Sequence, residues 1–74
     1  MDVHHLAKMA NQIGSFFEAY PDRDFAASEI AGHIRKFWEP RMRATMFEQM
    51  DAVKDELHPT VYQAFVKLQS TLAH

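Results

Sequence analysis

Three evenly spaced prolines constrain the fold of this 74-residue chain more than any other feature of its sequence. Pro21, Pro40 and Pro59 lie 19 residues apart and divide the chain into four pieces of about one helix each. Proline stops a preceding helix and suits the first turn of the next, because its ring fixes φ and it lacks a backbone N–H. No segment alternates apolar and polar residues as a half-buried strand does. The sequence therefore predicts an all-α bundle of four short amphipathic helices in a single domain, residues 1–74, with helices at about 2–19, 23–38, 40–55 and 59–73.

Apolar residues recur at helical spacing in each of the four pieces. The first two arcs comprise Val3, Leu6, Met9, Ala10, Ile13, Phe16, Phe17 and Tyr20, then Ala26, Ala27, Ile30, Ala31, Ile34, Phe37 and Trp38. The last two are narrower and comprise Met42, Met46, Met50, Val53 and Leu57, then Val61, Phe65, Leu68 and Leu72. We expect these arcs to form the core, with Asp2 capping the first helix and Asp22 or Asp24 capping the second.

The two glycines of the chain, Gly14 and Gly32, both fall inside predicted helices. Each destabilises its helix by about 1 kcal/mol relative to alanine. A glycine in this position indicates that a neighbour approaches the backbone closely, and Ala7, Asn11 and Gly14 together form a small-residue stripe. We expect two helices of the domain to cross there; contact with a partner protein is the alternative.

The residue types that carry catalysis and metal binding are missing or badly spaced. The chain has no cysteine, so it forms neither disulfides nor thiolate zinc sites, and nothing opposes a cytoplasmic location. It has no glycine-rich phosphate loop and no nucleophile motif, and the adjacent His4 and His5 point about 100° apart on a helix. We therefore assign no catalytic, cofactor-binding or metal-binding residue. Because apolar runs are only two or three residues long, we expect no membrane-spanning segment.

Positive charge and aromatic side chains are concentrated in one segment, residues 33–43. It contains His33, Arg35, Lys36, Phe37, Trp38, Glu39, Pro40, Arg41, Met42 and Arg43. Four Lys or Arg against one Glu give a net charge of +3, whereas the whole chain carries −2. This mixture is typical of protein interfaces and also of sites for single-stranded nucleic acid. Because the rest of the chain is acidic and repels phosphates, we favour a protein partner over nucleic acid.

Arg43 is expected at the margin of the third apolar stripe, where its charge needs a partner. It could stack on Phe47 one turn later, or pair within the domain with Glu18 or Asp22. A carboxylate on another protein is the alternative.

Two stretches of the chain resemble the delta-subunit family of NAD-dependent formate dehydrogenases. The first is Met9 to Phe17 (MANQIGSFF), followed by Pro21 and Asp22. The second is Ile30 to Arg43 (IAGHIRKFWEPRMR), which is similar to the family pattern Ile-Ala-x-His-Ile-x-x-Phe-Trp-x-Pro-Arg-Met-Arg. The resemblance covers the N-terminal 43 residues, and the remainder matches only in outline.

The resemblance implies a non-catalytic accessory subunit of a soluble bacterial complex that oxidises formate to carbon dioxide and reduces NAD. It implies that the chain itself binds no cofactor and associates with the catalytic alpha subunit. That partner would carry the molybdenum or tungsten bis(pterin guanine dinucleotide) centre and iron–sulfur clusters, and another subunit would carry FMN. The implied role is assembly, cofactor insertion or stabilisation in the cytoplasm.

Combining the charge pattern with the resemblance, we expect the partner to dock on the segment Phe37–Arg43 and on the polar edge of the first helix. The predicted partner-binding residues are Asn11, Gln12, Phe37, Trp38, Pro40, Arg41, Met42 and Arg43, with Trp38 and Arg41 as anchors and Arg43 as a charge partner. The alternative function is a small self-associating helical module that binds nucleic acid or regulates transcription. Self-association of the isolated chain is also compatible with the sequence.

Overall fold

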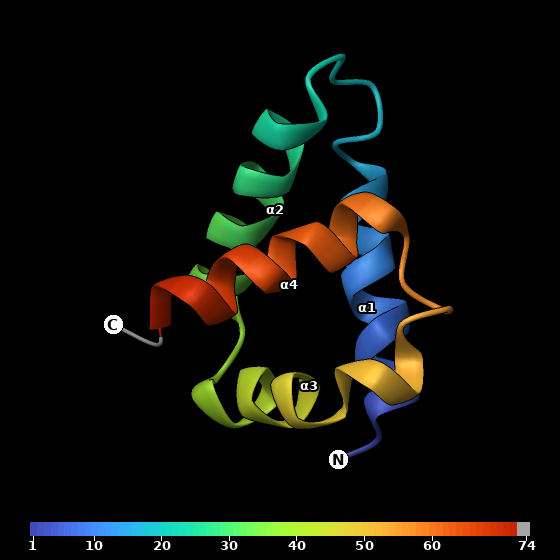
Figure 1. Ribbon diagram of the computed structural model, residues 1–74, viewed down its shortest axis with the longest axis vertical. Helices are drawn as coiled ribbons and strands as arrows, with labels where there is room; N and C mark the ends of the chain where they lie inside the picture. Colours follow the sequence, from blue (N-terminus) through green and yellow to red (C-terminus); the bar gives the residue numbers. More distant parts are fainter. Residues whose placement is uncertain (73–74) are drawn as a thin grey trace.

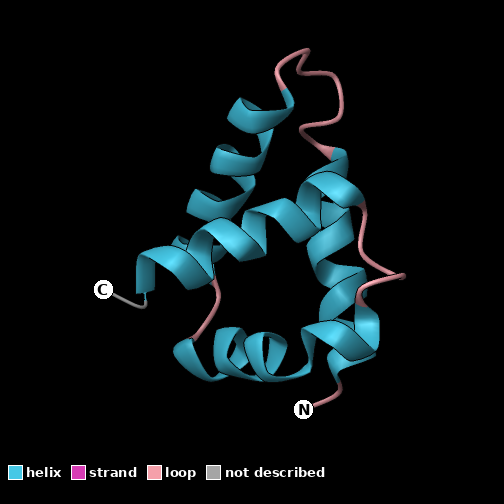
Figure 2. Ribbon diagram, viewed as in Figure 1, coloured by secondary structure: helices cyan, strands magenta, loops and turns pink. Residues whose placement is uncertain are grey.

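The computed structural model describes residues 1–72, which form four helices joined by loops (Figures 1 and 2). The helices are α1 (Val3–Ser15), α2 (Arg23–Phe37), α3 (Pro40–Val53) and α4 (Pro59–Leu72), and no strand occurs among the described residues. This confirms the predicted all-α bundle, and the last three helices begin at the predicted residues. The predicted end of the last helix, residue 73, lies outside the described part of the chain.

The start of each helix follows from its local sequence. Asp2 Oδ1 accepts a hydrogen bond from the His4 N–H at 2.9 Å, and Asp22 Oδ1 accepts one from the Asp24 N–H at 3.0 Å. Both aspartates therefore cap helices as expected, since each satisfies an N–H group that the first turn leaves free. Pro40 and Pro59 occupy the first positions of α3 and α4, where their missing N–H groups leave no intrahelical bond unmade.

The first helix is shorter than predicted. It ends at Ser15, whereas the predicted end was near residue 19. The amide of Phe16 donates to Ile13 O at 3.1 Å and that of Phe17 donates to Gly14 O at 2.9 Å, so the bonds tighten to three-residue turns. The helical periodicity then no longer applies to the next residues. As a result, Phe16 is 81% exposed and Tyr20 is 43% exposed, so their assignment to the core was wrong.

The helices pack mainly as two pairs, α2 against α4 and α1 against α3. In Figure 1, α4 passes across α1 near its own beginning and continues toward α2, which links the pairs. The largest fully buried side chains come from α2, α3 and α4 and are Ile30, Ile34, Met46, Val53, Val61 and Phe65. Met46 and Met50 are buried and Met42 packs against the core, so the methionine stripe fills the interior as expected.

The two glycines differ in what surrounds them. A Cβ added to Gly14 would lie 2.5 Å from Val61 Cγ2, so α1 and α4 cross closely at this point. The predicted close crossing within the domain is confirmed here. At Gly32, an added Cβ would meet nothing within 4 Å, so the same prediction is wrong for the second glycine.

Candidate partner-binding surface

The segment between α2 and α3 is a sharp elbow that Arg43 holds in place. Trp38 is extended (φ −82°, ψ 139°) and ends α2, and Pro40 begins α3 two residues later. One guanidinium nitrogen of Arg43, Nη1, donates to Trp38 O at 2.8 Å and to Arg35 O at 3.0 Å. These carbonyls belong to the last turn of α2 and its cap, where a cation is favourable. Arg43 therefore stabilises the elbow itself, through backbone carbonyls and not through the expected carboxylate.

Trp38 points into the domain and not toward a partner. Its side chain is only 5% exposed, and its ring centroid lies 5.6 Å from that of Phe65 in the centre of the core. This burial confirms the place of Trp38 in the second apolar arc, and it leaves little of the side chain for the predicted anchor contact with a partner. Trp38 instead fixes the end of α2 onto α4.

Phe37, the residue before Trp38, lies on the surface and is 65% exposed, so its assignment to the core with the second apolar arc was wrong. The His33 ring, one turn earlier on α2, lies 4.6 Å from the Phe37 ring between centroids. Lys36 Nζ is 5.6 Å from the ring centroid, within the range of a cation–π contact. One exposed aromatic ring thus lies close to both an imidazole and an ammonium group, and aromatic residues are enriched at protein interfaces.

Three cations of the elbow segment form no ion pair with the residues that the structure describes. Among residues 1–72, ion pairs join only His4 to Glu56 and Lys67 to Asp24. Arg35, Lys36 and Arg41 have none, and all three are exposed. We refer to Phe37 with Lys36 and Arg41 as the cationic elbow surface, whereas Arg35 lies two residues before Phe37 on α2 and faces another side of that helix. Of the other predicted residues, Pro40 is exposed and Met42 is half-buried against the core.

Asn11 and Gln12 lie apart from the elbow, on α1 beside the loop between α3 and α4. Asn11 Nδ2 donates to Glu56 O at 2.8 Å, and its Oδ1 accepts from the His58 N–H at 3.0 Å. Both hydrogen-bonding ends of this amide are thus used to hold the loop onto α1. Gln12 is exposed, and its carbonyl accepts a hydrogen bond from Ser15 Oγ. The structure does not bring these two residues together with Phe37–Arg43.

At the opposite end of α2 lies a row of three aromatic side chains, of which Tyr20 and Phe25 are exposed and Phe17 is half-buried against the core; none of the predicted partner-binding residues belongs to it. Ring centroids lie 5.6 Å apart for Phe17 and Tyr20 and 5.4 Å apart for Tyr20 and Phe25. Phe25 is 50% exposed. The available signal was the Pro21–Asp22 turn, since a turn ends the helix before Tyr20 and turns these rings outward.

No group of three or more His, Cys, Asp or Glu side chains that could hold a metal ion occurs in the described part of the chain. Across residues 1–72, none of the helices has the length and apolar character needed to cross a membrane. The fold and its surface define the class of protein: it is a small all-α domain, and its most distinctive exposed side chains are aromatic and cationic.

Comparison with known families places this chain more specifically. Residues 5–65 match the family model described as NADH-dependant formate dehydrogenase delta subunit FdsD. The match spans well over half of the chain, so the chain belongs to this family. It also extends beyond Arg43, where the motifs recognisable in the sequence end. No curated protein and no solved structure matches the chain.

Proposed function

We propose that this chain is a non-catalytic accessory subunit that binds the catalytic alpha subunit of a cytoplasmic NAD-dependent formate dehydrogenase. Membership of the delta-subunit family supports association with such a complex. The observation that carries the binding role is the exposed Phe37 ring among the unpaired cations of the elbow surface.

The cationic elbow surface favours a particular kind of partner surface. Phe37 exposes an aromatic ring that would gain free energy from burial in an apolar pocket. Lys36 and Arg41 would need carboxylates around that pocket, because burying an unpaired charge is unfavourable. We therefore expect an apolar depression with an acidic rim on the alpha subunit.

The chemistry of the complex belongs to the partner subunits in this proposal. The chain would bind no cofactor, and the molybdenum or tungsten centre, iron–sulfur clusters and FMN would lie in the other subunits. Its contribution would be to favour the folded, cofactor-competent form of the alpha subunit, since a ligand of the folded state stabilises that state by mass action.

Co-purification tests the proposed association. A tagged copy of the chain would be expressed with the complete set of formate dehydrogenase subunits, and the captured subunits quantified by mass spectrometry. We expect the alpha subunit at about one copy per tagged chain, and recovery of the tagged chain alone would contradict the proposal.

Variants of the elbow surface locate the contact. Phe37→Ala and Arg41→Ala should each lower capture of the alpha subunit by about tenfold, the effect of losing an interface anchor. Lys8→Ala on the exposed side of α1 is the matched control and should leave capture unchanged. Equal capture by all three variants would show that the elbow is not the docking surface.

A further inference from the structure

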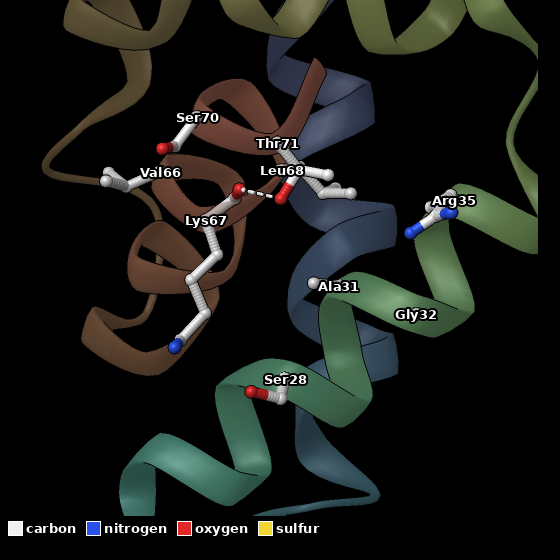
Figure 3. Close-up of a pocket in the computed structure, with 9 residues that line it drawn as sticks. All are labelled: Ser28, Ala31, Gly32, Arg35, Val66, Lys67, Leu68, Ser70 and Thr71. Atoms are coloured by element: carbon white, nitrogen blue, oxygen red, sulfur yellow. Dashed lines mark hydrogen bonds between the residues drawn. The ribbon is translucent and has the colours of Figure 1, made fainter. Parts of the chain in front are cut away.

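A groove of about 570 Å³ lies between α2 and α4 (Figure 3), and Phe37 is not among the residues that line it. Ala31 and Leu68 are the buried residues of its lining, and Gly32 contributes bare backbone. Val66, which is 44% exposed, lies on the α4 side. The volume is within the range of sites that hold ligands or partner side chains.

Gly32 is unexplained by the packing of the domain. Glycine is less stable than alanine inside a helix, and at Gly14 the contact with Val61 accounts for that loss. At Gly32 no atom of the other described residues, apart from the nearby backbone of α2 itself, lies within 4 Å of an added Cβ, so a methyl group would fit there freely. The absence of a side chain therefore leaves room for something outside the domain to approach the α2 backbone.

The charges of the groove are unbalanced. Its lining contains two cationic side chains, Arg35 and Lys67, and no carboxylate. Lys67 Nζ is 2.8 Å from Asp24 Oδ1, which neutralises it, whereas Arg35 has no ion pair among the described residues. Figure 3 shows Arg35 extending from α2 at the rim of the groove. A carboxylate on an occupant would therefore complement the groove at the Arg35 end.

The shape of the lining fits a helix. On α2 it runs over Ser28, Ala31, Gly32 and Arg35, positions that share one face over about two turns, or roughly 10 Å. A helix laid along such a face makes contacts at the same spacing, and a bare glycine lets the two backbones come close.

We propose that the α2–α4 groove receives an acidic amphipathic helix of the alpha subunit, which packs over Gly32 and pairs a carboxylate with Arg35. This rests on the proposed function, since it names a second contact of the same association. A second copy of the chain docked groove to groove is disfavoured, because it would bring like charges together.

Filling the groove tests its occupancy. Gly32 is exposed on α2 and a Cβ there meets no described residue, so Gly32→Leu should fold, but it should lower capture of the alpha subunit by about tenfold; circular dichroism of the variant checks the fold. Gly32→Ala should lower capture less while melting at a higher temperature than the wild type. Ala52→Leu, the same enlargement at an exposed position on α3, is the control and should behave as the wild type.

Charge reversal tests the chemistry of the occupant. Arg35→Glu should weaken capture by about tenfold, and Arg35→Lys by much less. Lys8→Glu on α1 is the control for the change in net charge. A photo-crosslinking residue at Ser70 should then attach to a helix of the alpha subunit that contains Asp or Glu.

The outcomes separate the two proposals. Failure of the wild-type chain to capture the alpha subunit would overturn both. If Phe37→Ala disrupts capture while Gly32→Leu and Arg35→Glu do not, the proposed function holds and the groove is not a contact. A crosslink from Ser70 to a second copy of the chain, or to a non-helical segment, would also overturn the groove proposal.

Discussion

Gly14 and Gly32 are the same residue in the same kind of position, inside a helix, yet the structure uses them differently. At Gly14 the missing side chain lets α4 cross α1, with Val61 occupying the space that a Cβ would take. At Gly32 the corresponding space is empty and opens on the groove between α2 and α4. The comparison indicates that a helical glycine can be required by the fold at one site and be available for an external contact at another.

The same contrast recurs at the elbow between neighbouring side chains. Trp38 is buried against Phe65, whereas Phe37 is exposed beside His33 and Lys36. Arg43 binds two carbonyls of the domain, whereas Arg41 has no ion pair among residues 1–72. Within seven residues, one aromatic and one arginine stabilise the fold, and one of each remains free for a partner.

The largest expected effect tests the aromatic pair. Trp38→Ala should destabilise the isolated domain by about 3–5 kcal/mol, the typical loss for a large buried aromatic, which is most of the stability of so small a domain. Phe37→Ala should change stability by less than about 0.5 kcal/mol, because its side chain is mostly exposed. Chemical denaturation followed by circular dichroism measures both. Similar losses from the two variants would contradict the contrast.

The arginine pair should show a smaller difference. Arg43→Met removes the hydrogen bonds to Arg35 O and Trp38 O and should cost about 2 kcal/mol of unfolding free energy, as expected for bonds from a charged donor. Arg41→Met should be nearly neutral in the same denaturation experiment. A stable Arg43→Met variant would mean that the elbow is held by packing alone.

Gly14→Ala should destabilise the domain by about 1 kcal/mol, because overpacking against Val61 outweighs the better helix propensity of alanine. Val61→Ala creates room for the new methyl group, so the double variant should be more stable than the sum of the two single changes predicts. Additive losses would show that Val61 is not the obstacle.

The smallest effect has the opposite sign. Gly32→Ala should stabilise the isolated domain by about 0.5–1 kcal/mol, since the added methyl meets no atom and reduces the freedom of the unfolded chain. A rise in the melting temperature measures this gain. A fall would mean that the space at Gly32 is used within the domain.

Much of the fold could be predicted because its signals are local. The prolines mark the starts of α3 and α4, and Asp2 and Asp22 cap their helices by short-range hydrogen bonds. The end of α1 was missed, because the apolar residues Phe16 and Tyr20 continue the helical spacing although the backbone tightens at Ser15. Their exposure depends on where the chain turns, which apolar periodicity does not report.

The binding surface was harder to predict, since exposure depends on tertiary packing. Phe37 and Trp38 are adjacent aromatics on one predicted arc, and only the extended backbone at Trp38 directs one outward and the other toward Phe65. Likewise, the carbonyl partners of Arg43 come from the neighbouring helix end and leave no mark in the sequence pattern. The groove beside Gly32 requires the placement of α4 against α2, which no segment specifies alone.

The most direct test is the unfolding temperature of the alpha subunit, measured in three samples. These are the alpha subunit without this chain, with the wild-type chain, and with the Gly32→Leu variant. If the chain stabilises its partner through the groove and the elbow, the alpha subunit should unfold at a higher temperature with the wild-type chain than without it. Gly32→Leu should remove most of that increase although the variant chain is itself folded. An unfolding temperature of the alpha subunit that is the same with and without the wild-type chain would contradict the account.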